Sequence, residues 1–212
     1  MKNISTRWLL KHEACEEGVE WFKNCGETEV KRVLAKLRDD EQFDYAIWLI
    51  KRVNTKRENV RLAIYCAELC LHRFEERYPN DKRPRNAIKA AKRWLKNPTE
   101  ANRLKAWSAA WSAAESAAWS APASEASWSA AAWSAWSAAR SAAAEPAAEW
   151  SAARSAAEWS EWSAAESAAW SAPASEAAWS KESARSEVYE KIINYEIRIL
   201  RDRAKAQEVG EV

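Results

Sequence analysis

Residue types suited to catalysis are scarce in this chain. The only histidines are His12 and His72, and neither lies in a recognisable nucleophile signature. Three glycines are too few for the usual Gly-rich loops that hold phosphates. Cys66 and Cys70 share one helix face with His72 nearby, but a structural zinc site needs four such ligands. We therefore expect a protein that is not an enzyme and has no metal or cofactor.

Tryptophan is the residue type in this chain that is best suited to bind a ligand. Most of the 15 tryptophans lie in residues 107–180, a segment written only with Ala, Ser, Trp, Glu, Arg and Pro. Indole rings stack on nucleobases, and a neighbouring arginine can reach the phosphates of a small nucleotide. A ligand site of this kind would use, in chain order, Trp111, Trp119, Arg140, Arg154, Trp162 and Trp170. The alternative is that these rings pack small-residue helices together, and the sequence leaves both interpretations open.

The same segment contains an internal repeat. Residues 111–129 recur at 162–180, and only Ser127 against Ala178 differs between the two copies. A duplicated unit would present one surface twice, which favours self-assembly or a homo-oligomer. Slippage of a low-complexity gene segment explains the repeat equally well.

Helix is the only regular structure that the composition favours, so we expect an all-α fold. Ala is the best helix former, and Pro122, Pro146 and Pro173 would break or open helices within the segment. Apolar residues at helical spacing predict further helices. These are expected over residues 5–24, as one helix or two helical turns that Gly26 ends, and over 28–37, with Thr28 as the cap, 43–53, 55–78 and 84–95. Thr55 and Glu58 fit a capping box, and the helix that they open has one stripe of Val60, Ile64, Ala67, Leu71 and Phe74. The helix from residue 84 is expected to bury Ile88, Ala91 and Leu95, and a closing amphipathic helix carries the stripe Val188, Ile192, Tyr195 and Ile199, flanked by Tyr189, Ile193 and Leu200.

Charge and composition divide the chain into three parts that we expect to share one core: 1–97, 98–180 and 181–212. The first 106 residues hold 24 basic and 16 acidic residues, a net of +8, whereas residues 107–180 hold 2 Arg and 8 Glu, a net of −6. The basic half would pack against the acidic array or attract an anionic partner. The acidic array would repel a long nucleic acid.

The chain begins without an apolar leader, so we expect a cytoplasmic protein with reduced cysteines and no membrane contact.

One stretch carries a resemblance to a known family. Residues 75–95 read EERYPNDKRPRNAIKAAKRWL, which contains the signature YP-D-RPR-AI-AA-WL. Upstream, Cys15, Gly18 and Trp21-Phe22 fit the same pattern, as do Tyr45-Ala46 and Trp48-Leu49. The chain resembles a family of immunity proteins that occur in bacterial genomes, in mobile elements and in phages. The signature positions are Asp81, Arg83, Pro84 and Arg85.

The resemblance implies an all-helical protein that neutralises a target by binding it, without catalytic residues. Three hypotheses follow for this immunity or counter-defence role. The target is a protein toxin or effector, which the chain sequesters. Alternatively, it is a small cyclic nucleotide signal held between Trp rings. A third hypothesis makes the chain a structural protein that assembles through its duplicated Trp units.

Overall fold

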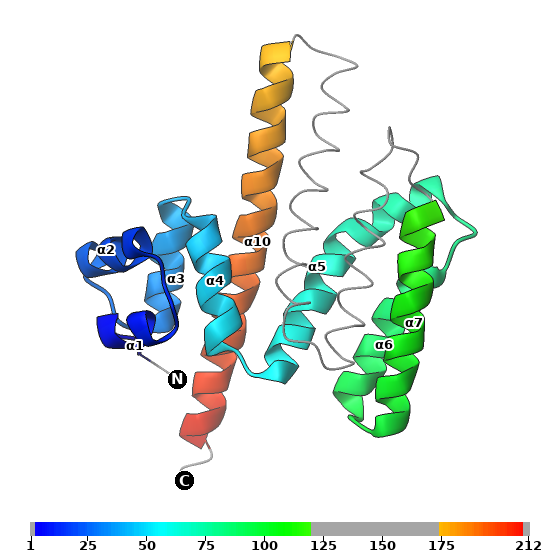
Figure 1. Cartoon of the computed structure of the whole chain (residues 1–212), viewed down its shortest axis with the longest axis horizontal. Helices are drawn as coiled ribbons and strands as arrows, with labels where there is room; N and C mark the ends of the chain where they lie inside the picture. The colour runs from blue at the N-terminus through cyan, green and yellow to red at the C-terminus, as the bar shows by residue number, and fades with distance from the viewer. Residues whose placement is uncertain (1–2, 120–173, 210–212) are drawn as a thin grey trace. The chain divides into compact units, whose positions relative to one another are not determined.

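The regular structure of the chain is helical wherever it is described, as expected. A computed structural model describes residues 3–119 and 174–209, without the side chains at 70, 73, 77, 114–119, 174–185 and 206–209. An isolated bridge joins Asn3 and Glu29. The helices in these two ranges are α1 (Thr6–Lys11), α2 (Glu16–Cys25), α3 (Val30–Asp39), α4 (Phe43–Val53), α5 (Lys56–Arg77), α6 (Arg83–Lys96), α7 (Glu100–Trp119) and α10 (Ala174–Val209) (Figure 1).

The chain forms two compact units. Unit 1 comprises Met1–Asn54 with Ile193–Val212, and unit 2 comprises Thr55–Ile192. The helix α10 contributes its first part to unit 2 and its last part to unit 1. The three-part division at residues 97 and 180 rests on composition and stays a prediction.

Unit 1 begins with two short helices where the sequence predicted a single helical region over residues 5–24. The backbone of Glu13 has a φ of 60°, which turns the chain between α1 and α2. Gly26 ends α2 in the left-handed conformation (φ 71°), as its lack of a side chain allows. We expected Thr28 to begin the next helix, but α3 starts at Val30 with Glu29 as its N-cap. The carbonyl of Thr28 instead accepts a hydrogen bond from the amide of Ile4 (2.9 Å).

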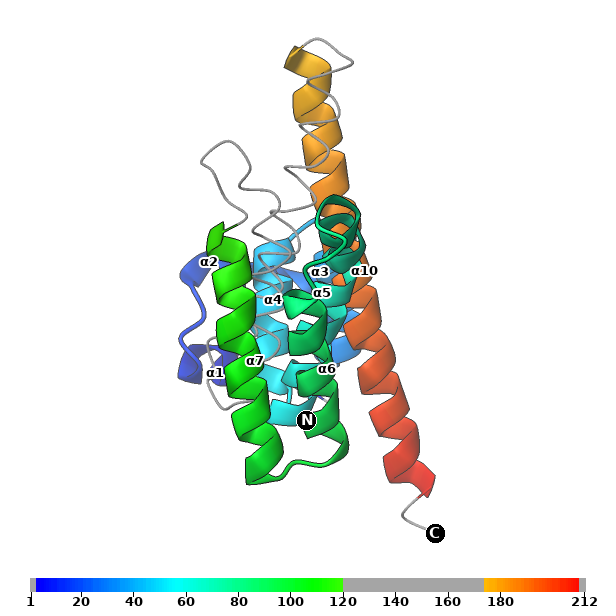
Figure 2. The ribbon, with the colours of Figure 1, turned by 90° about the vertical axis from the view of Figure 1, so that its right-hand side faces the viewer.

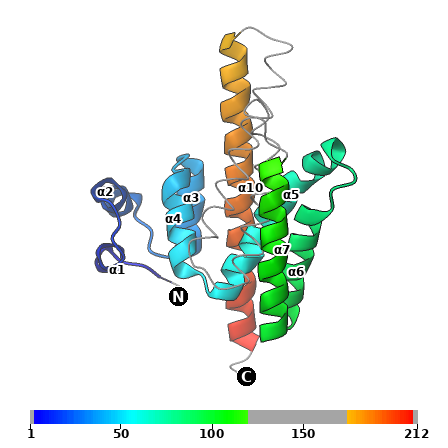
Figure 3. The same ribbon diagram turned by 45° about the vertical axis from the view of Figure 1, so that its right-hand side comes forward.

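The core of unit 1 lies between α3 and α4, which pack side by side (Figure 3). Both helices bury their apolar faces at the spacing that the sequence predicted; the buried residues are Val30, Val33, Leu34, Leu37, Ala46, Ile47, Leu49, Ile50 and Val53. The last part of α10 joins this unit through a hydrogen bond from Arg38 to the Asn194 side chain (2.5 Å).

Unit 2 begins with the capping box that the sequence predicted. The Thr55 hydroxyl accepts from the amide of Glu58 (3.4 Å), and the Glu58 carboxylate accepts from the amide of Thr55 (2.7 Å). This reciprocal pair satisfies two backbone donors at the start of α5. The buried stripe of α5 contains the expected residues Val60, Ile64, Ala67, Leu71 and Phe74. In α6 the structure buries Trp94, whereas the sequence favoured Leu95, which is partly exposed.

The helices α6 and α7 form an antiparallel pair (Figure 2). The buried side of α7 consists of small side chains, namely Asn102, Ala106, Ala110 and Ala113, whereas α6 buries Pro84, Ile88 and Trp94 as well as Ala87, Ala90 and Ala91. Asn102 fixes the turn between the two helices, because its side chain donates to the carbonyl of Asn97 (2.7 Å). Alanine faces of this kind let two helices approach to about 8 Å between axes.

The closing helix differs from the sequence prediction at its start and in its buried stripe. It begins at Ala174, directly after Pro173 and earlier than the expected start near residue 181. Its buried residues are Tyr189, Ile192, Ile193 and Glu196. The predicted stripe members Val188, Tyr195 and Ile199 are partly exposed, because the buried face is rotated toward Tyr189 and Ile193.

The alanine contact of α7 predicts a sharp difference between two leucine substitutions. Ala106 is 0% exposed, so Ala106→Leu should lower the free energy of unfolding by about 1–3 kcal/mol through overpacking. Ser108 is exposed on the same helix, and Ser108→Leu should change that free energy by less than about 0.5 kcal/mol. Urea unfolding of both variants measures the difference. Equal effects would show that the alanine face is not a packed contact.

Candidate binding surface

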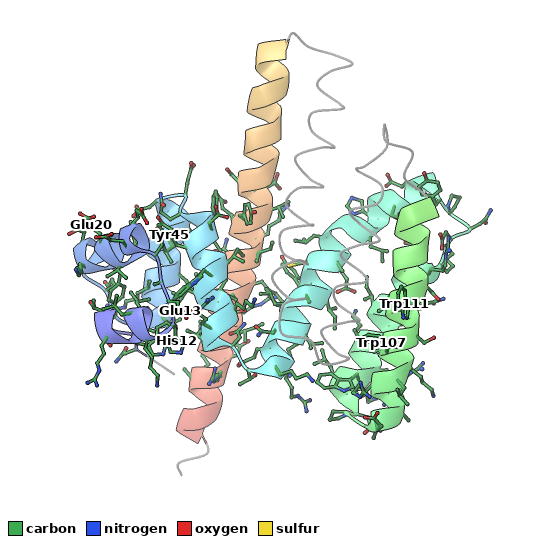
Figure 4. The ribbon with its side chains drawn as sticks, in the orientation of Figure 1. His12, Glu13, Glu20, Tyr45, Trp107 and Trp111 are labelled. Atoms are coloured by element: carbon green, nitrogen blue, oxygen red, sulfur yellow. The ribbon has the colours of Figure 1, made fainter. Side chains whose placement is uncertain are left out.

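Three large apolar side chains form an exposed row along α7, which we call the α7 row. Leu104 is 53% exposed, Trp107 41% and Trp111 60%. Their spacing of three and then four residues places them on one side of the helix, opposite the buried alanines. The two indoles lie one turn apart (Figure 4). Leu10 in unit 1 is the other large hydrophobic residue that is exposed among the side chains that the structure describes.

An ion pair closes the N-terminal end of the α7 row. Arg103 donates to both carboxylate oxygens of Glu100, at 2.8 and 2.6 Å. These hydrogen bonds, together with the charge of Arg103, lower the pKa of the Glu100 carboxyl below its ordinary range. Because the two charges compensate each other, the row offers a contact surface that is apolar and locally neutral.

The two interpretations of the tryptophans stay open in this structure. Trp107 and Trp111 lie on one side of α7 and are exposed, whereas alanines line the buried side of the helix. Trp119 ends α7, and its side chain is not among the described ones. Arg140, Arg154, Trp162 and Trp170 lie outside the described residues, so the nucleotide site stays a prediction.

Unit 1 contains an aromatic cluster that the sequence analysis missed. The rings of Trp8 and Trp48 meet edge to face with centroids 6.3 Å apart, and the Arg52 guanidinium lies 4.0 Å from the Trp48 ring centroid. Arg52 also donates to the carbonyl of His12 (3.2 Å), the residue that ends α1. Burial lowers the pKa of Arg52, and the charge of Glu13 opposes that shift. The four-residue spacing of Trp48 and Arg52 was the available signal. The rings contact each other, so this cluster fastens α1 to α4.

The histidines and the candidate metal ligands do not form a site in the part of the chain that the structure describes. The His12 ring lies against Trp8, with centroids 4.1 Å apart, and its Nδ1 is 2.8 Å from the Trp8 carbonyl oxygen. His72 is exposed on α5. No group of three or more His, Cys, Asp or Glu residues suited to a metal ion occurs in the part of the chain that the structure describes. Among the same residues no helix is long and apolar enough to span a membrane.

The signature residues hold the turn between α5 and α6. Asp81 accepts from the backbone amide of Arg83 (3.0 Å) and from its guanidinium (2.7 Å). Pro84 is buried at the start of α6, where its missing N–H costs no hydrogen bond. Arg85 forms a bidentate ion pair with Glu75 of α5. Each signature position thus has a packing or capping role in this structure.

The upstream signature residues are also structural. The Cys15 Sγ caps α2 by accepting from the amide of Gly18 (3.3 Å). A Cβ at Gly18 would lie 3.2 Å from that sulfur and 3.8 Å from the ring of Tyr45, so Gly18 lets the three residues pack. Burial, followed by the charge of Cys15, raises the pKa of Tyr45. Trp21 donates from its indole nitrogen to Asp40 (3.0 Å), which connects α2 to the end of α3.

The Glu75–Arg85 pair predicts a pH-dependent contribution to stability. Hydrogen bonds from Arg85 lower the pKa of Glu75 below its ordinary value of 4.5, although burial opposes the shift. The pair therefore stabilises the fold fully above about pH 4.5, and its contribution disappears as the pH falls through the lowered pKa. Glu75→Gln should cost about 1 kcal/mol at pH 7 and progressively less as the pH falls below 4.5.

Thermal unfolding of the wild type and the Glu75→Gln variant from about pH 2 to pH 7 measures this effect. Glu100→Gln is the matched control, because Glu100 has an arginine partner but is exposed. Its effect should be smaller at every pH. A Glu75→Gln effect that does not decrease at all between pH 7 and about pH 2 would mean that packing, not charge, is responsible.

Comparison with known proteins supports the family resemblance noted in the sequence. The family described as "Imm-5 like putative immunity protein" matches residues 49–158, just over half of the chain. That range contains the whole of α5, α6 and α7, with the signature turn and the α7 row. No curated protein and no solved structure matches the chain significantly. The match over more than half of the chain shows that this protein belongs to the Imm-5-like family of immunity proteins.

Proposed function

We propose that this chain is a non-enzymatic immunity protein that neutralises a protein effector by binding it, with the α7 row at the centre of the contact. Membership of the immunity family supports an immunity-type role. The observation that carries the mechanism is the exposed row itself, because two indole rings on the outer side of a helix cost free energy in water unless a partner covers them.

The geometry of the row suits a groove on another protein. Anchors at positions i, i+3 and i+7 are how an amphipathic helix enters an apolar groove. Tryptophan is among the residues that contribute most to the affinity of protein interfaces. The helix α7 is already held by α6, so little conformational entropy is lost when a partner binds.

The exposed area favours a separate partner over a second copy of the chain. A whole Trp side chain buries up to about 250 Å², so the exposed fractions of Trp107 and Trp111 amount to about 250 Å² together. Two such pairs of rings face to face would bury about 500 Å², well below the roughly 1,200 Å² of a stable interface. A groove that encloses the helix buries much more surface around the same three anchors.

The proposal predicts that the double variant Trp107→Ala, Trp111→Ala loses its partner while keeping its fold. Both rings point into water in the free protein, so their removal should change the free energy of unfolding by less than about 1 kcal/mol. In the complex each ring fills a pocket, and the double variant should bind at least about 100-fold more weakly. Native mass spectrometry of protein purified from cells that carry bacterial toxin or defence systems measures the bound partner.

Leu10→Ala is the matched control, because Leu10 is 61% exposed and lies on α1, outside the α7 row. It should retain the partner. A retained adduct of a few hundred daltons, lost on denaturation, would replace the proposal with the nucleotide alternative. Large homo-oligomers lost in the double variant would favour self-assembly. Equal loss of partner in the Leu10→Ala control would show that the α7 row has no special role.

A further inference from the structure

The helix α6 carries a strongly one-sided charge. It contains six basic and no acidic residues in the sequence RPRNAIKAAKRWLK. Five of the six are exposed, at spacings of three and four residues that place them on one side of the helix. We call this the α6 cationic face: Arg85, Lys89, Lys92, Arg93 and Lys96.

Neighbouring carboxylates neutralise only one edge of this face. Arg85 is paired with Glu75, and Lys92 is paired with Glu68 (2.6 Å), and both glutamates belong to α5. Lys89, Arg93 and Lys96 have no carboxylate within ion-pair distance among the residues that the structure describes. Three cations without an ion-pair partner thus follow one another along about 10 Å of the helix, and of these Lys89 lies within electrostatic reach of Glu75.

The helix dipole favours Arg93 and Lys96 in the last turn of α6, but the rest of this arrangement costs helix stability. Arg85 and Lys89, then Lys89 and Arg93, are like charges at i and i+4, and each pair destabilises the helix by a few tenths of a kcal/mol. The first turn contains no acidic residue, although the positive end of the helix dipole favours one there. A face that is kept at a cost in stability is typical of a functional surface.

We propose that the α6 cationic face binds an acidic protein surface that offers at least three carboxylates along about 10 Å. This inference rests on the proposed function and states the chemistry of the partner. A face-to-face contact with a second copy of the chain does not fit, because the two cationic faces would repel each other. A nucleic acid would meet the same cations, and the proposed function, in which the target is a protein, favours the acidic protein surface.

The cationic face and the α7 row contribute differently to recognition. Exposed cations steer an acidic partner toward the surface, and their effect falls as salt screens them beyond about 10 Å. The apolar row slows dissociation once contact is made. Binding through the α6 cationic face is therefore strongly salt-dependent.

The variant Lys89→Glu separates binding from folding. It creates opposite charges at i and i+4 with both Arg85 and Arg93, so its melting temperature should equal or exceed that of the wild type. Its affinity for an acidic partner should nevertheless fall about tenfold at low salt. Lys105→Glu is the matched control, because Lys105 is also exposed in unit 2, and no charged residue lies three or four positions away.

The probe is a helical peptide of repeating EAAAEAA heptads, which places carboxylates at i, i+4 and i+7, with oligothymidylate as the nucleic-acid comparison. Titration calorimetry of the full chain at about 50 and 300 mM NaCl should show peptide binding that weakens with salt and is reduced by Lys89→Glu alone. Equal loss with Lys105→Glu would overturn the inference, because net charge would then explain it. Oligothymidylate bound in preference to the peptide, and lost with Lys89→Glu, would identify a nucleic-acid surface instead.

The same variants distinguish failure of this inference from failure of the proposed function. Partner loss with Trp107→Ala, Trp111→Ala but not with Lys89→Glu would leave the proposed function intact and refute the acidic partner surface. Loss with Lys89→Glu alone would support the cationic face and remove the α7 row from the interface.

Discussion

Contact between alanine faces of α6 and α7 determines what unit 2 presents to solvent. Helices with small facing side chains approach closely, and a large ring between them would force them apart. Because Ala106, Ala110 and Ala113 are buried, Trp107 and Trp111 must lie on the other sides of α7. The exposed aromatic row is thus a geometric consequence of how the two helices pack. The same close contact holds the row on a rigid element.

Ion pairs and caps at the other edge of α6 position its cations. Asp81 holds the start of the helix through Arg83, and Glu75 holds its next turn through Arg85. These contacts explain the signature residues without a binding role. Lys89, Arg93 and Lys96 on the same helix remain exposed. Arg85 is therefore both a signature residue and a member of the α6 cationic face, whereas Lys89, Arg93 and Lys96 lie outside the signature.

Local chemistry made part of the fold predictable from the sequence. The Thr55–Glu58 capping box, the Gly26 stop and the bounds of α4 follow from neighbouring residues, and the structure confirms each of them. Predictions failed where tertiary context decides. The choice between Thr28 and Glu29 depends on the bridge to Asn3, and the rotated stripe of α10, with Glu196 inside it, depends on the surrounding helices. The sequence left open whether the tryptophans pack helices together or bind a ligand. The structure shows that Trp107 and Trp111 are exposed and that alanines occupy the buried side of the same helix.

The α7 row would bind through apolar contact and the α6 cationic face through charge, and this difference limits the kind of partner that can use both. The α7 row lies opposite the side of α7 that is buried, whereas the α6 cationic face lies on α6 beside α5. A partner that uses both surfaces must contact α6 and α7 together. Apolar anchors give affinity that salt hardly changes, and exposed cations give attraction that salt removes. A single acidic partner would thus meet steering charge first and apolar anchors second, an order suited to rapid capture followed by slow release.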